Sequence, residues 1–304
     1  MNEQLERILA ELAALLDGTV DTFIAATNAA EREALDGLIA LLDDLEYGSG
    51  GSVRQTAANL RRVADFRAEA TRILNSGSFA SAVTEYAAAY GAIQRLANQY
   101  FETAVANFTV PAVLNALREQ AVSQAVGTLA GAGLDAGVSA QIERLLLANI
   151  STGATKAQLA GALRQNLLSL PGTNGILARY SETYTDTALH TFARQYMDLA
   201  AGDLGLDWYL YEGSKKETSR PFCVKFAGKF WHRREVENMG RGLQPSGNTP
   251  LSGDELQGRI KGTNASSIFS NAGGWRCRHI FIPVAIEAVP ESAIARARAA
   301  GFVQ

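Results

Sequence analysis

Two cysteines and two histidines near the C-terminal end supply the side chains that bind soft and borderline metal ions. The chain holds only two cysteines and three histidines, and four of these five lie between Cys223 and His279. We predict that residues 223–232 form two short strands joined by a two-residue turn at Ala227-Gly228. This pairing would place Cys223 directly opposite His232, with both side chains on one face.

The second half of the cluster is Cys277-Arg278-His279, followed by the apolar run Ile280-Phe-Ile-Pro-Val284. Residues two apart share a face in an extended segment, so Cys277 and His279 should point the same way. Three interpretations stay open. The four side chains can hold a structural zinc ion, Cys223 and Cys277 can form a disulfide, or both cysteines can be buried free thiols. The Cys-x₂-Cys spacing that makes a zinc assignment strong does not occur here.

Composition narrows the class of protein. The chain has 304 residues, of which 47% are hydrophobic and 19% charged, with a net charge of −3. These values predict one large domain or two domains of ordinary size. They argue against a disordered chain and against a protein that binds nucleic acid over its whole surface. Two cysteines and an acidic start suggest synthesis in the cytoplasm. The small-residue run 123–140 is interrupted by glycines and is a poor candidate for a membrane span.

The N-terminal half has the periodicity of helices. Residues 1–47 carry leucines at helical spacing and eleven acidic groups, which predicts an acidic amphipathic arm made of a helical hairpin or a long broken helix. Gly48-Ser-Gly-Gly-Ser52 reads as a flexible linker, and 53–150 reads as a helical assembly region. The apolar stripe of the arm can bind a partner or pack against the rest of the chain.

Residues 151–304 form the third predicted region, in which the residue composition changes along the sequence. Helices are expected within 155–200, starting at a Thr155/Gln158 capping box. A small β unit follows at 206–284, with a Gly- and Ser-rich loop that holds a short helix starting at Ser252, and a terminal helix covers 291–300. The expected fold class is mainly α, with a multi-helix N-terminal region and a small, loop-rich C-terminal α+β unit.

A basic run lies beside the first cysteine. It can contact the phosphate backbone of DNA, dock on an acidic protein surface or form a solvated hairpin face. Its members are Lys215, Lys216, Arg220, Lys225, Lys229, Arg233 and Arg234.

Catalytic signatures are absent from the sequence. It has no nucleophile elbow, Walker loop, His-Glu-x-x-His pair or Rossmann glycine pattern. Arg179, Ser181 and Glu182 are residue types that ADP-ribosyltransferases use, but those enzymes carry them on separate strands. Here Arg179 and Glu182 lie within one helical turn, which favours an ion pair on the helix face or a buried structural link to the β unit. His190, on the same helix, is expected to be an ordinary packed or surface residue.

The order of features from Arg179 to Val284 resembles the Mu F-like head morphogenesis family, the minor capsid proteins of tailed bacteriophages. Members of that family show an Arg-Thr-Glu-like helix start, a Trp-containing strand, a Thr-Arg-x-x-Cys element, a Gly-Lys turn, a Gly/Pro-rich loop and a final Cys-Arg-Cys. The corresponding positions are Arg179-Tyr-Ser-Glu182, Trp208, Ser219-Arg-Pro-Phe-Cys223, Gly228-Lys229, the 240–274 loop and Cys277-Arg278-His279.

The chain departs from the family pattern at two places. Gly273-Gly-Trp275 replaces a His-Pro pair, and His279 replaces the last cysteine. A Cys-to-His exchange preserves metal ligation but abolishes a disulfide at that position, which favours a structural Cys₂His₂ zinc site.

The resemblance implies a non-catalytic protein of the virion, in the head or portal region. Its expected partners are the portal protein, the major capsid or scaffold proteins and DNA during assembly, packaging or delivery, and it would be oligomeric within the virion. Two alternatives remain open. One is a C-terminal effector enzyme that acts on nucleic acid or NAD, similar to ADP-ribosyltransferases, and the other is a neck or ejection protein.

Overall fold

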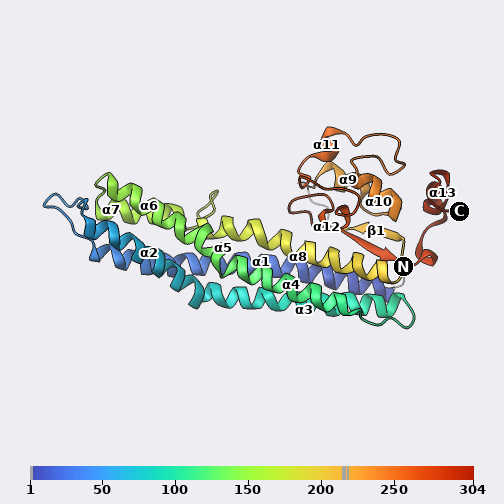
Figure 1. Cartoon of the computed structure of the whole chain (residues 1–304), viewed down its shortest axis with the longest axis horizontal. Helices are drawn as coiled ribbons and strands as arrows, with labels where there is room; N and C mark the ends of the chain where they lie inside the picture. The colour runs from blue at the N-terminus through green and yellow to red at the C-terminus, as the bar shows by residue number, and fades with distance from the viewer. Residues whose placement is uncertain (1–2, 214–216, 218) are drawn as a thin grey trace. The chain divides into compact units, whose positions relative to one another are not determined.

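The computed structural model describes residues 3–213, 217 and 219–304. Its contacts divide the chain into two compact units. The sheet unit comprises Met1–Asp17, Tyr90–Ala121 and Asp186–Gln304, and the helical unit comprises Gly18–Ala89 and Val122–Thr185. The chain is mainly helical with one small antiparallel sheet, so the predicted fold class is confirmed (Figure 1).

Long helices contribute residues to both units. They are α1 (Glu3–Leu41), α3 (Ser78–Ala104), α4 (Ala112–Leu129) and α8 (Ile176–Asp203). The helical unit also holds shorter elements, namely η1 (Leu42–Asp44), α2 (Ala57–Ser76), α5 (Ala132–Leu134), the π-helical turn η2 (Asp135–Ser139), α6 (Ala140–Ser151) and α7 (Lys156–Leu167). The predicted capping box is present at the start of α7, where the Thr155 side chain accepts from the Gln158 main-chain N–H.

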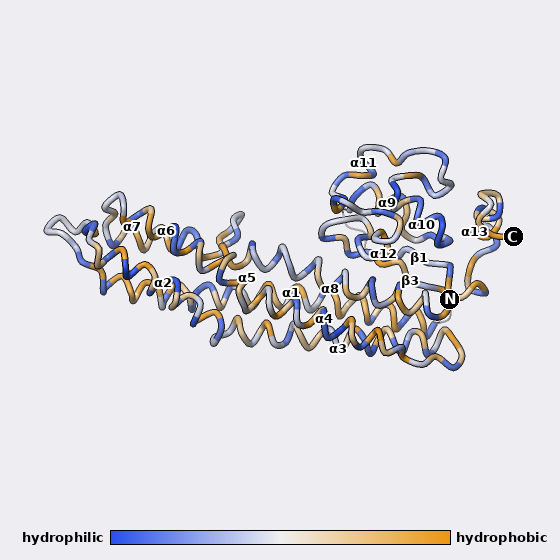
Figure 2. Tube along the Cα trace, viewed as in Figure 1, coloured by the Kyte–Doolittle hydropathy of each residue, from blue (hydrophilic) through white to orange (hydrophobic). Residues whose placement is uncertain are grey.

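The core of the helical unit is built from the apolar stripe of α1. Apolar residues, orange in Figure 2, recur at intervals along this helix, and Leu38 is fully buried. The Phe23 ring contacts Phe79 and Tyr86 of α3, with centroids 5.5 and 5.2 Å apart. Burial of these side chains is the main favourable contribution to folding here.

A buried carboxylate on α1 holds the start of α8. Glu31 is 1% exposed and accepts hydrogen bonds from the main-chain N–H groups of Ser169, at 2.7 Å, and Ala178, at 3.1 Å. The N–H groups of the first helical turn have no partner inside the helix, and a negative charge is favourable there. Glu31 therefore caps α8 from a distant part of the sequence.

The structure corrects two predictions for the N-terminal region. The acidic arm is neither a hairpin nor broken within 3–41, because α1 is one continuous helix whose apolar stripe is buried. The segment Gly48–Ser52 is a hydrogen-bonded turn and not a flexible linker. Gly48 N–H donates to Ser52 O at 2.8 Å, and the next residue, Val53, donates to Ala154 O at 2.9 Å. Neither compact unit follows the predicted boundaries at 47, 53 and 150.

The described part of the sheet unit contains three strands in the order β2-β1-β3, and both pairings are antiparallel. They are β1 (Trp208–Glu212), β2 (Lys229–His232) and β3 (Ile280–Val284). The other elements are α9 (Pro221–Phe226), α10 (Arg233–Gly240), α11 (Gly253–Leu256), α12 (Ile268–Asn271), η3 (Ile286–Ala288) and α13 (Glu291–Ala299). The expected strands at β1 and β3, the short helix after Ser252 and the terminal helix are all present.

The two faces of the sheet have different surroundings. Tyr209, Tyr211, Trp231 and Phe281 belong to one aromatic core, in which the rings of Tyr211 and Phe281 stack with centroids 4.3 Å apart. The intervening residues of β1 and β3, such as Leu210, line a groove on the opposite side. This alternation follows from the period of two in a strand.

The predicted hairpin at 223–232 is wrong. Residues Pro221–Phe226 form the short helix α9, with proline at a first-turn position, where its fixed φ and missing N–H are tolerated. Strand β2 pairs with β1, and His232 lies opposite Trp208. Among the described residues, no helix has both the length and the apolar character needed to cross a lipid bilayer.

Candidate functional site

Three of the four predicted ligands gather in the aromatic core of the sheet unit. Cys223 projects from α9, and Cys277 and His279 come from the extended segment before β3. The two Sγ atoms are 3.6 Å apart, and Nδ1 of His279 is 4.0 Å from Sγ of Cys277. Their potential ligand atoms all lie within 4.8 Å of one another, and all three residues are buried. We call these residues the Cys–His cluster.

Two further residues enclose the Cys–His cluster. The hydroxyl oxygen of Tyr211 lies 3.4 Å from Sγ of Cys223 and 3.5 Å from Sγ of Cys277. Gly273 covers the sulfurs from another side, because a Cβ atom at this position would lie 2.5 Å from Sγ of Cys223. Only glycine permits this approach of the main chain.

His232, the fourth predicted ligand, does not belong to the cluster. Its neighbour Trp231 faces the aromatic core, so the alternation along β2 directs His232 to the other face of the sheet. There its ring contacts Trp208, with centroids 5.3 Å apart, and its Nδ1 accepts from Arg234 N–H at the start of α10. The predicted Cys₂His₂ set is therefore corrected to Cys223, Cys277 and His279.

A buried arginine on α8 fixes the backbone of the ligand-bearing segment. Arg194 is 2% exposed. Its guanidinium donates to the main-chain carbonyls of His279 at 2.8 Å, Ser270 at 3.1 Å and Cys277. A buried guanidinium needs several acceptors to offset the cost of leaving water. Arg194 therefore acts as a clamp that positions Cys277 and His279.

The two thiols differ in their tendency to ionise. The hydrogen bond with Cys277 and burial raise the pKa of the Cys223 thiol. The same sulfur contact lowers the pKa of Cys277, against the effect of burial, because it stabilises the Cys277 thiolate. Burial raises the pKa of Tyr211 well above its ordinary value. The contact between the two sulfurs therefore shifts the pKa values of the two thiols in opposite directions.

The cysteines are not bridged in the structure. Both are free and buried, and their separation of 3.6 Å exceeds the bond length of about 2.0 Å in a disulfide. Of the three interpretations open from the sequence, the geometry is that of two thiols in contact, with an imidazole beside them. This set offers one nitrogen and two sulfur donors to a metal ion.

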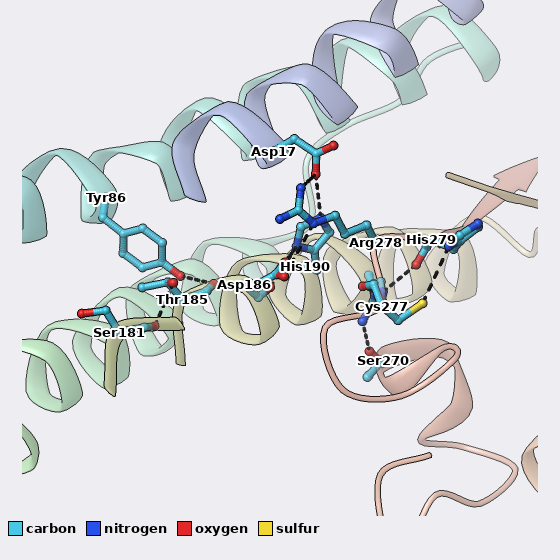
Figure 3. A network of polar contacts seen from close by, with 11 residues as sticks. Asp17, Tyr86, Ser181, Thr185, Asp186, His190, Ser270, Cys277, Arg278 and His279 are labelled. Carbon is cyan, nitrogen blue, oxygen red and sulfur yellow. Dashed lines mark hydrogen bonds and ion pairs between the residues drawn. The ribbon is translucent and has the colours of Figure 1, made fainter. Parts of the chain in front are cut away.

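A charged network, not anticipated from the sequence, lies on the other side of the Cys277–His279 segment. Arg278 points away from the sulfurs and forms ion pairs with Asp17 of α1 at 3.0 Å and Asp186 of α8 at 3.6 Å (Figure 3). His190 lies between the same two carboxylates, with Nδ1 3.1 Å from Asp186 Oδ1 and Nε2 3.8 Å from Asp17 Oδ1. The i, i+4 spacing of Asp186 and His190 was the only local signal for this network.

The network borders a groove of about 510 Å³ between the first turns of α1 and the sheet. The walls are mostly apolar, and the ionisable side chains among them are Glu6, Asp17, His190, Glu212 and Arg278. The described lining contains no serine, threonine or cysteine. Arg278 and His190 are both engaged by carboxylates at the edge of this groove.

The predicted basic run is largely occupied by contacts within the sheet unit. Lys215 and Lys216 lie outside the described residues. Lys225 pairs with Glu255, and Arg233 forms ion pairs with Asp198 at 3.2 Å and Asp207 at 3.3 Å. Arg220 donates to the carbonyl of Trp275, and Lys229 donates to the carbonyl of Lys225 at 2.8 Å. Lys229 and Arg234 have exposed side chains.

The pair Arg179 and Glu182 does not form a buried link. Arg179 is exposed and donates to the carbonyl of Asn174, whose side chain donates to Glu182 at 2.7 Å. Both residues therefore contact the loop before α8 at the surface of the helical unit.

Comparison with protein-family models, with curated proteins and with solved structures found no match to this chain. A Cys–His cluster that is buried among aromatic rings and covered by Gly273 is inaccessible to a macromolecular substrate. Its arrangement suits a role in holding the fold.

Proposed function

We propose that this protein is a minor capsid or head morphogenesis protein of a tailed bacteriophage or prophage. It acts by binding the portal and the prohead, and it resides in the head or portal region of the virion after synthesis in the host cytoplasm. One observation carries the proposal: Mu F-like motif positions follow one another in order along the sheet unit, from Trp208 through Cys223 and Gly228-Lys229 to Cys277-Arg278-His279.

The structural roles of these positions support the proposal. Trp208 begins β1, and Gly228 has a φ of 78°, which favours glycine in the turn before β2. Cys223 and Cys277, 54 residues apart in the sequence, meet in the core. Motif positions that are distant in the sequence thus lie together in one core, which supports reading them as parts of one domain.

The exposed acidic face of α1 is the surface we assign to partner docking. Glu3, Glu6 and Glu11 are exposed, whereas Ile8 and Leu12 of the same helix are buried. Deletion of this segment would remove core residues and confound a binding experiment with unfolding. Substitution of the exposed carboxylates leaves the core intact.

Copurification tests the proposal. The tagged full-length chain is co-expressed with portal, scaffold and major capsid proteins from the same genome, and retained proteins are identified by mass spectrometry. We expect the portal protein to copurify, and we expect Glu3→Gln/Glu6→Gln/Glu11→Gln to weaken this association. The control is Glu217→Gln/Asp254→Asn/Glu291→Gln, which removes the same number of exposed carboxylates at positions outside α1. Failure of all three partners to copurify would count against the proposal.

DNA contact during packaging or delivery is the second part of the proposed function. The exposed side chains of Lys229 and Arg234 are the basic groups best placed for it. Because neighbouring basic groups are paired within the unit, this contact would be weak, independent of sequence and easily screened by salt.

A further inference from the structure

We propose that Cys223, Cys277 and His279 bind one zinc-type metal ion, with the hydroxyl oxygen of Tyr211 at the fourth tetrahedral position. This proposal concerns the stability of the sheet unit and does not depend on the proposed function. It replaces His232, which the sequence suggested, by a tyrosine that no spacing rule indicates.

The distances between donor atoms carry the proposal. A tetrahedral ion bound about 2.3 Å from each of two thiolates holds the sulfurs about 3.8 Å apart, and a sulfur and a nitrogen or oxygen ligand about 3.5 Å apart. The observed separation of the two sulfurs is 3.6 Å. Tyr211 Oη is 3.4 and 3.5 Å from them, and His279 Nδ1 is 4.0 Å from the nearer sulfur. The two sulfurs and the tyrosine oxygen thus already have close to tetrahedral spacing, and the imidazole must move closer to complete the set.

The imidazole of His279 provides a second, independent observation. His279 is 3% exposed, and its Nε2 has no hydrogen-bond partner among the described residues. An unpaired buried polar group costs about 1–3 kcal/mol. The described residues therefore leave one nitrogen of this buried ring unsatisfied. A metal ion bound through Nε2 would remove that cost, and one bound through Nδ1 would replace its contact with Sγ of Cys277.

The surroundings are those of a structural site. Gly273 leaves no room for a side chain over the sulfurs, and Arg194 holds the carbonyls of both Cys277 and His279. A structural zinc ion has four protein ligands and no open position, whereas a catalytic one keeps a place for water or substrate. The ion would join β1, α9 and the start of β3, which are distant in the sequence. A sheet of three short strands gains stability from such a link.

The test uses the full-length chain, purified under reducing conditions and reconstituted with zinc or cobalt(II). We expect close to one ion per chain by elemental analysis. The cobalt form should show the thiolate-to-metal charge-transfer band and the intense visible bands of a tetrahedral site. We expect each single ligand substitution to weaken the affinity for the ion at least tenfold. The three variants are Cys223→Ser, Cys277→Ser and His279→Ala. His279→Cys, which keeps a ligand, should retain the ion.

Two variants distinguish the proposed ligand set from others. His232→Asn preserves an acceptor at the start of α10 and should bind the ion as the wild type does. Tyr211→Phe should still bind cobalt(II), with altered visible bands, because a water molecule replaces one ligand. Wild-type protein that takes up neither ion would overturn the proposal, and this result does not depend on how any variant folds. Loss of the ion in His232→Asn would also overturn it, and an unchanged cobalt spectrum in Tyr211→Phe would remove the tyrosine from the ligand set.

Discussion

The sulfur atoms of Cys223 and Cys277 lie 3.6 Å apart although 54 residues separate them in the sequence. One projects from a short helix and the other from an extended segment, and Tyr211 of the central strand touches both. The contact joins the start and the end of the loop-rich part of the sheet unit. Substitutions that disturb this contact should therefore lower the stability of the whole sheet unit.

Gly273→Ala should destabilise the sheet unit, because the added Cβ would lie 2.5 Å from Sγ of Cys223 and 3.1 Å from Sγ of Cys277. Overpacking of this kind costs about 1–3 kcal/mol. Urea unfolding followed by tryptophan fluorescence measures the loss, since Trp208 and Trp231 are buried in this unit. Gly253→Ala is the matched control, because no atom lies within 4 Å of the added Cβ. Equal stability of the two variants would contradict the proposed close approach.

Arg194→Met should lower the free energy of unfolding more than the same substitution of a surface arginine on α8. The substitution leaves the carbonyls of Ser270, Cys277 and His279 without this donor, and each unpaired buried carbonyl costs about 1–3 kcal/mol. We expect a total loss of roughly 3 kcal/mol in the free energy of unfolding. Arg179→Met, at an exposed position of α8, should change it by less than about 0.5 kcal/mol. A similar small effect at Arg194 would mean that the clamp does not contribute to stability.

Asp186 should make the sheet unit sensitive to acid. Burial raises the pKa of this carboxyl, but the hydrogen bond from His190 and the charges of His190 and Arg278 outweigh burial and hold the pKa below its ordinary value. A lowered folded-state pKa contributes stability above the unfolded-state value of about 3.9, and this stability is lost as the pH falls through the folded-state pKa.

The free energy of unfolding of the wild type should therefore fall more steeply below pH 4 than that of Asp186→Asn, by up to about 1.4 kcal/mol per pH unit. Denaturant titrations between pH 3 and pH 7 provide the measurement. Asp203→Asn, at an exposed position of α8, should behave as the wild type does. Parallel curves for the wild type and Asp186→Asn would show that the carboxylate is not stabilised by its partners.

Binding to double-stranded DNA should be weak and should respond only modestly to salt. Each neutralised phosphate contributes about −0.9 to the slope of log K against log salt, so two exposed basic groups predict a slope of roughly −2. Fluorescence anisotropy with a labelled duplex measures this slope, and Lys229→Ala/Arg234→Ala should bring it close to zero. Lys225→Ala is the control, since Lys225 is paired with Glu255. A much steeper slope that survives the double substitution would place the DNA contact elsewhere.

Local signals in the sequence were sufficient for much of the fold. The predicted capping box at Thr155 and the predicted short helix after Ser252 are both present in the structure. The aromatic and β-branched runs at β1 and β3 form strands. These features depend on neighbouring residues, so their physical causes are visible in the sequence itself.

Features that depend on distant partners were not predictable in this way. The segment after Arg220 resembled a hairpin strand, but Pro221 starts a helix and β2 pairs with β1 instead. That choice of partner directs His232 away from the cysteines and brings Tyr211 to them. Arg194 had no signature because its acceptors lie 76 to 85 residues further along the chain. The sequence left open whether the apolar stripe of the acidic arm binds a partner or packs on the chain, because periodicity alone does not reveal tertiary packing.

The most direct test of the proposed function is the protein content of purified phage particles. Particles are induced from a strain that carries the gene, purified by density gradient and analysed by quantitative mass spectrometry against the portal protein as an internal standard. We predict that the chain is present at a fixed ratio to the portal protein in DNA-filled heads and in proheads. Its absence from both kinds of particle, while it is abundant in the host lysate, would contradict the assignment as a minor capsid protein.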